Sequence, residues 1–130
     1  MNGIDYLLDT NFVLGLLKSN PETLAVINER HIESHQCAYS AITRMELLGF
    51  PGITPDEESL ILGKLTFLAY QPISPVVENI AIRLRRTHKV KLPDAIIAAT
   101  ALAADAELLT FDRQLQVVLA AEIAAQSIKP

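Results

Sequence analysis

The sequence has little that could anchor the chain in a membrane or cross-link it. Its single cysteine, Cys37, cannot form a disulfide within the chain. The longest apolar stretch, residues 95–104, includes Thr100 and has about half of the roughly 20 residues that a membrane-spanning helix needs. No basic region followed by an apolar run lies near residue 1, so no signal peptide is expected. These absences predict a soluble, cytoplasmic protein.

Positive charge is also scarce. Lysine and arginine together number 11 against 15 aspartates and glutamates, which gives a net charge of −4 at pH 7. This balance argues against a protein that binds nucleic acid through bulk positive charge. It does not exclude a metal-dependent nuclease, because acidic side chains that bind cations are counted in the same net charge.

Hydrophobic residues, in contrast, are sufficient for a sizeable core. They make up half of the 130 residues, a length that fits one domain spanning 1–130. We expect strands at residues 4–8, 36–40, 69–73, 107–110 and 124–128, and helices at 11–18, 21–31, 41–48, 56–67, 75–89, 94–104 and 112–119. This alternation predicts an α/β fold, a three-layer α/β/α sandwich in which helices cover both faces of a small parallel sheet.

Four acidic residues stand out by their positions in this pattern. Asp9 ends the first expected strand, and Glu46 lies in the helix that follows the second. Asp94 begins the helix after Pro93, and Asp112 follows the strand at 107–110. Ligands of parallel sheets gather at the carboxyl ends of the strands. Carboxylates that converge there from separate segments are the ligands that Mg²⁺ or Mn²⁺ prefers.

Each acidic residue also has a purely structural interpretation. Asp9 and Asp112 could cap the helices that follow them, and Asp94 could favour a helix dipole. Glu46 could be an ordinary solvated helix residue. For Asp94 this interpretation is weaker, because residues 95–104 are apolar on every face and predict a buried helix. A carboxylate at the mouth of a buried helix costs free energy unless a cation or donor pairs with it.

Four segments resemble the motifs of PIN domains, and most closely those of VapC-like toxins from prokaryotic toxin–antitoxin pairs. They are LDTN at residues 8–11, Thr43 with Glu46 and Leu47, LPDAIIAATA at 92–101, and LTFD at 109–112. The segments occur in the family's order and span nearly the whole chain. The Leu-Pro-Asp-Ala segment is fairly specific, whereas Asp-Thr-Asn alone is a weak signal.

The resemblance implies Mg²⁺- or Mn²⁺-dependent hydrolysis of RNA phosphodiester bonds. It implies Asp9, Glu46 and Asp94 as the core acidic triad and Asp112 as a fourth, more variable ligand. Supporting roles, such as orienting carboxylates, would fall to Thr10, Asn11 and Thr110. The resemblance further implies an antitoxin protein as partner. A homodimer is expected because residues 60–70 hold more large apolar side chains than one helix face needs.

Other features carry less information. The basic residues Arg83, Arg85, Arg86, His88, Lys89 and Lys91 precede Asp94 and could follow an RNA backbone or form a solvated face. His31 and His35 are four residues apart, but no further zinc ligand accompanies them at the usual spacing. Cys37 lies in an expected strand and is interpreted as a core residue rather than a nucleophile.

Two other functions remain open on these observations. A non-catalytic PIN-like module that binds RNA or a protein would keep the fold without the chemistry, and a metal-dependent cleavage assay separates the two. A phosphoacceptor receiver domain also has a parallel sheet and an aspartate at a strand end. That function needs a further acidic pair near the first strand and a lysine after a late strand, and residues 110–112 offer no such lysine.

Overall fold

Four short strands form a parallel sheet in the computed structural model, which describes residues 3–128. They are β1 (Tyr6–Leu8), β2 (Cys37–Ser40), β3 (Ala69–Gln71) and β4 (Glu107–Leu109), in the order β3-β2-β1-β4. Leu8 pairs with Tyr39 of β2 and with Leu109 of β4, so these three strands end at nearly the same level. The segments that follow β1, β2 and β4 therefore emerge side by side.

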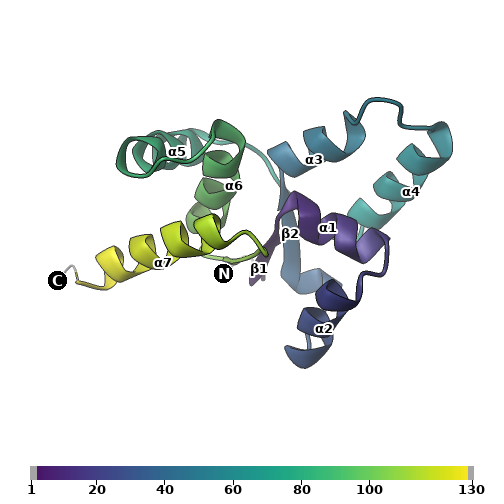
Figure 1. Ribbon diagram of the computed structural model, residues 1–130, viewed down its shortest axis with the longest axis horizontal. Helices are drawn as coiled ribbons and strands as arrows, with labels where there is room; N and C mark the ends of the chain where they lie inside the picture. Colours follow the sequence, from purple (N-terminus) through teal and green to yellow (C-terminus); the bar gives the residue numbers. More distant parts are fainter. Residues whose placement is uncertain (1–2, 129–130) are drawn as a thin grey trace.

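Helices cover both faces of this sheet. They are α1 (Thr10–Leu17), α2 (Pro21–Glu29), α3 (Ala41–Leu48), α4 (Pro55–Leu65), α5 (Pro75–Thr87), α6 (Leu92–Ala103) and α7 (Arg113–Ile128), with a short 3₁₀ turn, η1 (Ser34–Gln36), before β2. Figure 1 shows α5, α6 and α7 on one side of the strands and α1 to α4 on the other. The three-layer α/β/α arrangement predicted from the alternation of elements is confirmed.

Alternate residues of each strand point to opposite faces, and in the central strands β1 and β2 both faces are largely buried. Leu7 and Leu108 lie in the core formed with α5, α6 and α7. Leu8 and Leu109 lie in the second core, formed with α1, α3 and α4. A parallel sheet covered on both faces requires such continuous apolar strands. The strands leave no polar position in the middle of the sheet, which confines the polar side chains of interest to the strand ends.

The helix α6 is the most deeply buried helix, as its sequence predicted. Ala95, Ala98, Ala99 and Ala101 contribute almost no exposed surface, and α6 packs along α5 and against β1 and β4. Side chains as small as alanine let a helix axis approach a sheet closely. This close packing fixes the position of α6 along the sheet. The first turn of α6, which carries Asp94, is therefore held at the carboxyl end of the sheet.

Helix starts agree closely with the capping signals in the sequence. The Asn20 side chain accepts hydrogen bonds from the backbone of Glu22 and Thr23 before α2, with Pro21 in the first turn. Ser74 caps α5 through the Val77 amide in the same way. These polar side chains satisfy amide groups that have no partner inside the helix.

The expected edge strand at residues 124–128 is wrong, because these residues belong to α7. The helix expected at 112–119 continues without interruption to Ile128. The segment is rich in alanine, the strongest helix former, and holds no proline or glycine that would end the helix. Its apolar residues therefore extend a helix instead of adding a fifth strand.

The apolar segment 60–70 runs from the second half of α4 into β3. Leu60 is 54% exposed, Phe67 66% and Tyr70 45%. The surplus of large apolar side chains inferred from the sequence is thus found at the surface. None of the helices within residues 3–128 is long and apolar enough to cross a membrane.

Two glycines should respond to alanine substitution in opposite directions. A Cβ at Gly15 would lie 2.9 Å from the Cβ of buried Thr23 and closer still to its hydroxyl, where α1 crosses α2. We expect Gly15→Ala to lower the free energy of unfolding by about 1–3 kcal/mol through overpacking. Gly63 in α4 has open space around it. Gly63→Ala should raise the free energy of unfolding by about 0.5–1 kcal/mol. Urea denaturation of both variants tests the close packing of α1 on α2. Equal changes in the free energy of unfolding for the two variants would contradict it.

Candidate functional site

Asp9 occupies the junction between β1 and α1. Its backbone amide donates to the Leu109 carbonyl at 3.2 Å, which ties the junction to β4. Its side chain caps α1, because Oδ1 accepts the Phe12 amide at 2.8 Å. Thr110, which follows β4, also hydrogen-bonds the Asp9 carboxylate. Asp9 is therefore a helix cap, as the structural interpretation expected. The two oxygens of its carboxylate nevertheless offer more acceptor sites than the cap uses.

The electrostatic surroundings of Asp9 show what lies near it. Burial is the largest cause that raises the pKa of this carboxyl group above its usual value. The hydrogen bonds from Thr110 and Phe12 oppose this effect, and the negative charges of Asp112 and Asp94 add to it. Carboxylates from three separate segments are thus close enough to repel one another.

Asp94 lies in the first turn of α6 and is half-buried. Burial raises its pKa most, followed by the negative charges of Asp112 and Glu46, whereas the charge of Lys91 lowers it. Asp94 therefore joins the fourth carboxylate, Glu46, to the group around Asp9. A helix dipole alone would stabilise the charged form of Asp94, whereas burial and the two neighbouring carboxylates disfavour it.

Glu46 is exposed on α3, yet its side chain is held in place. Thr10 donates a hydrogen bond to Glu46 Oε1 at 2.6 Å, and the hydroxyl groups of Thr10 and Thr43 are 3.0 Å apart. The Ser40 hydroxyl donates to Thr43 Oγ1 at 3.4 Å. Because each hydroxyl has one proton, the chain of donors runs from Ser40 through Thr43 and Thr10 to Glu46. The interpretation of Glu46 as an ordinary solvated residue does not account for this chain.

Asp112 begins α7. Its Oδ1 accepts the amides of Gln114 at 2.9 Å and Leu115 at 3.2 Å, so it caps the helix as the structural interpretation expected. Its own amide donates to Thr110 Oγ1 at 3.0 Å. Thr110 therefore connects the two aspartates that follow β1 and β4. The second oxygen of Asp112 is not used by the cap.

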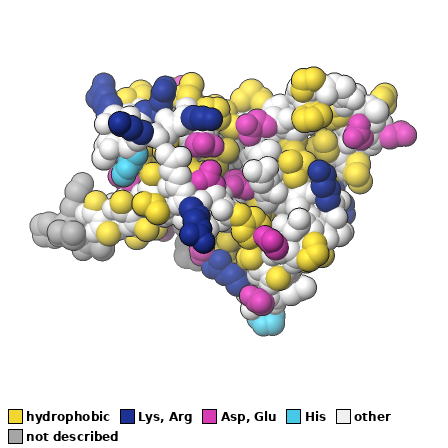
Figure 2. Space-filling model, in the orientation of Figure 1, with side chains coloured by type: hydrophobic (Ala, Val, Ile, Leu, Met, Phe, Trp, Pro, Cys, Tyr) yellow, Lys and Arg dark blue, Asp and Glu magenta, His cyan; other side chains and the backbone are white. Residues whose placement is uncertain are grey.

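One pocket of about 530 Å³ is lined by all four acidic residues together with Thr10 and Asn11. Figure 2 shows acidic side chains gathered near the middle of this face, between α3 and α6. Within residues 3–128, no three aspartate, glutamate, histidine or cysteine side chains lie close enough together to hold one ion in this arrangement. The donor set itself, carboxylate and hydroxyl oxygens around a shared pocket, fits a hard cation such as Mg²⁺.

The arrangement and order of these motifs correspond to a known family over most of the chain. The sequence pattern of the PIN domain matches residues 6–119. The chain belongs to the PIN domain family. A comparison with curated protein sequences found no significant match.

Several solved structures have the same fold. A chain of a toxin–antitoxin complex from Klebsiella pneumoniae is 30% identical, with a TM-score of 0.72, over 83% of this chain and 87% of that one. FitAcB from Neisseria gonorrhoeae is 24% identical with a TM-score of 0.71, over 88% and 92%. VapBC2 from Rickettsia felis, solved with a DNA fragment from its promoter, is 19% identical with a TM-score of 0.73, over 88% and 93%. The resemblance to PIN toxins stated from the motifs is confirmed.

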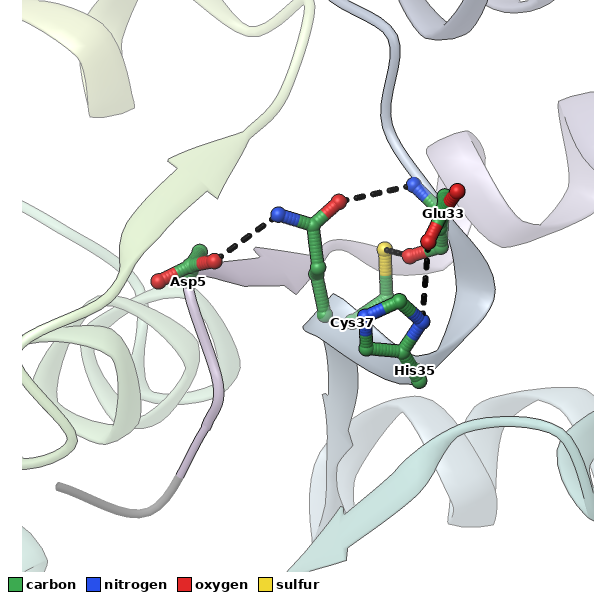
Figure 3. A network of polar contacts seen from close by, with 5 residues as sticks. Asp5, Glu33, His35 and Cys37 are labelled. Atoms are coloured by element: carbon green, nitrogen blue, oxygen red, sulfur yellow. Dashed lines mark hydrogen bonds and ion pairs between the residues drawn. The ribbon is translucent and has the colours of Figure 1, made fainter.

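The cysteine and the histidines lie away from the pocket of this PIN domain. Cys37 begins β2, and so lies at the opposite end of the sheet from Asp9. Figure 3 shows its thiol directed at the Glu33 carbonyl, with His35 beside the Glu33 carboxylate. Burial raises the pKa of the Cys37 thiol to about 11, which agrees with a core residue and not with a nucleophile.

The basic residues before Asp94 differ in their surroundings. Arg83 donates to Glu122 of α7 at 2.6 Å, and His88 lies 3.2 Å from the other oxygen of Glu122. These two residues therefore join α5 to α7. Lys91 acts on Asp94 and so faces the carboxylates. The residues Arg85, Arg86 and Lys89 are exposed, and their role in RNA binding stays a prediction.

Sequence reasoning missed several residues of the pocket and its support. Ser40 was not predicted at all, and Thr43 was named only as part of a motif, without a role. Both are fully buried and support Glu46 through Thr10. Ser40 precedes a helix after an apolar strand, a position that favours a capping serine. Lys18 and Phe50 line the pocket, but neither belongs to a motif and nothing in the sequence marks them.

The hydroxyl chain to Glu46 can be tested at Thr10. Thr10→Val has nearly the same shape but donates nothing to Glu46. We expect Mn²⁺ affinity in calorimetric titration to fall by about 10–100-fold, the effect of losing a group that orients a metal ligand. Thr10→Ser keeps the hydroxyl and should restore most of the affinity. Equal Mn²⁺ affinities for both variants would show that this chain of hydroxyl groups does not position Glu46 as a metal ligand.

Proposed function

We propose that this PIN domain is a ribonuclease that hydrolyses RNA phosphodiester bonds with Mg²⁺ or Mn²⁺. The observation that carries the proposal is the convergence of Asp9, Glu46, Asp94 and Asp112 from four separate segments on one pocket. The effects of neighbouring carboxylates on the pKa values of Asp9 and Asp94 support the proposal. They show that negative charges lie close together without an equal number of positive charges beside them. Such an arrangement is costly for the fold and useful for binding cations.

The four carboxylates would hold the metal, and the rest of the pocket positions them. A bound Mg²⁺ or Mn²⁺ ion supplies Lewis acidity, which lowers the pKa of water and stabilises negative charge on a phosphate. Asp9 and Asp112 are each fixed by backbone amides, so their carboxylates have little freedom to rotate. Glu46 is oriented by Thr10. Ser40 is fully buried, and Thr10, the hydroxyl residue that lines the pocket, donates its proton to Glu46. We therefore propose water as the nucleophile.

The proposed partner is an antitoxin protein, which would make the chain the toxin of a VapBC-type pair in the cytoplasm. The support is the likeness to a chain of a toxin–antitoxin complex at 30% identity. The antitoxin would inhibit cleavage at the acidic pocket, where an arginine side chain could pair with the carboxylates. The exposed cations Arg85, Arg86, Lys89 and Lys91 are available for RNA phosphates, whereas Arg83 is engaged with Glu122.

We also expect a homodimer through the apolar segment 60–70. Its exposed side chains, Leu60, Leu62, Phe67 and Tyr70, would leave water at a two-fold contact. Sedimentation at micromolar concentration should give about twice the mass of one chain. A single species with the mass of one chain at that concentration would contradict the dimer.

A second candidate function is a non-catalytic module with the same fold. The observation that favours it is that, among the described residues, no three ligands already share a centre. Cleavage of a structured RNA that depends on Mg²⁺ or Mn²⁺ and stops with EDTA would exclude this candidate. RNA binding without cleavage under the same conditions would support it.

The proposal makes a distinctive prediction for Asp94. Asp94→Asn keeps the shape but removes a charge that burial, Asp112 and Glu46 all disfavour. In metal-free buffer the variant should therefore melt at the same or a higher temperature than wild type. With Mn²⁺ it should lose at least about 100-fold in cleavage rate, the scale of one major electrostatic stabiliser.

Glu78→Gln is the matched control. Glu78 lies in the first turn of α5, is exposed and is outside the pocket. Its replacement should lower stability by about 0.3–1 kcal/mol through the helix dipole and leave cleavage unchanged. If Asp94→Asn instead behaves like this control, being less stable but fully active, Asp94 is a helix partner and the metal site proposed for the four carboxylates fails.

A further inference from the structure

The pocket that holds the four carboxylates extends well beyond them. Its far end, between α1, α4 and the loop that joins α3 to α4, is lined by Leu14, Lys18, Phe50, Ile53, Glu57 and Ile61. The whole volume of about 530 Å³ lies within the roughly 300–1,000 Å³ typical of ligand pockets. We propose that this far end binds one unpaired nucleobase of the RNA, stacked on the aromatic ring of Phe50. The inference rests on the proposed function.

Phe50 is the residue that gives this end its character. It follows α3, whose last turn ends at Gly49, and its side chain is 67% exposed. The next residues form a turn in which Gly52 has a positive φ of 84°, a conformation that favours glycine. An exposed aromatic ring at the rim of a pocket offers an apolar face for stacking. Proteins that bind single-stranded RNA use aromatic rings in this way.

The charges at the far end favour a neutral occupant. Lys18 and Glu57 both line it, so one positive and one negative charge offset each other. Glu57 is fixed by the Thr54 amide, which donates to its Oε1 at 3.0 Å. No carboxylate within residues 3–128 forms an ion pair with the Lys18 amine. A phosphate at the far end would meet Glu57, whereas an uncharged base meets no net charge. The phosphate is therefore placed at the carboxylate end and the base at the apolar end.

This division of the pocket selects among RNA structures. A base in a duplex is already paired and stacked, and the grooves of an A-form helix do not expose its flat face. A base in a loop or single strand can turn away from its neighbours and stack on Phe50. The pocket therefore discriminates by RNA structure, before any contact reads the identity of the base.

Three variants separate stacking from mere apolar contact. Phe50→Leu keeps apolar volume but loses the aromatic face, Phe50→Trp keeps the face, and Val117→Ala shortens an equally exposed apolar side chain outside the pocket. The probe is a fluorescein-labelled single-stranded RNA of 12 nucleotides, followed by fluorescence anisotropy with Ca²⁺ present. We expect Phe50→Leu to weaken binding by about 5- to 30-fold, and the other two variants to bind as wild type does. A duplex of the same sequence should compete poorly with the probe and should not distinguish the variants.

Equal affinities of wild type and Phe50→Leu for the single strand would overturn the inference, and would leave this face to a protein partner. Tight binding of the duplex would overturn it as well. The cleavage assay with Mn²⁺ separates this failure from failure of the proposed function. Cleavage by wild type with no effect of Phe50→Leu contradicts the nucleobase site alone. Binding that depends on Phe50 without any cleavage contradicts the ribonuclease and leaves the nucleobase site standing.

Discussion

The mutual repulsion of partly buried carboxylates is the constraint on which the site depends. Burial and neighbouring negative charge both raise the pKa values of Asp9 and Asp94. Bringing such groups together lowers the free energy of unfolding at neutral pH, and binding of a cation would raise it again. The backbone around the pocket is arranged to keep them there, because each aspartate is placed by a strand end or a helix start.

The small side chains of α6 make that placement practicable. Ala95, Ala98 and Ala99 are completely buried, so α6 lies close to β1 and β4. The helix cannot slide along the sheet without opening cavities in a closely packed core, which would lower stability. Asp94 is thereby fixed opposite Asp9, which is bound to β4 through the Leu109 carbonyl. Packing on one face of the sheet thus sets the geometry of charges at its edge.

Most of the fold could be predicted from local signals, and the exceptions have physical causes. Caps at Asn20 and Ser74 mark helix starts because the chemistry of a cap is local. The strand expected at residues 124–128 is instead the end of α7. The apolar character of this run suggested a strand, but its alanines favour a helix. The aspartates were found through strand ends and motifs. Phe50 and Lys18 could not be found, because only the tertiary packing of α1 and α4 brings them to the same pocket.

The most direct test of this account is thermal denaturation of the wild-type chain with increasing Mn²⁺. If the carboxylates bind metal in the folded state alone, the melting temperature rises steadily with the logarithm of Mn²⁺ concentration above the dissociation constant. Neutralising the pocket with the ion should also remove the destabilising repulsion. A melting temperature that stays constant up to millimolar Mn²⁺, in a protein shown to be folded, would contradict the metal site and the function built on it.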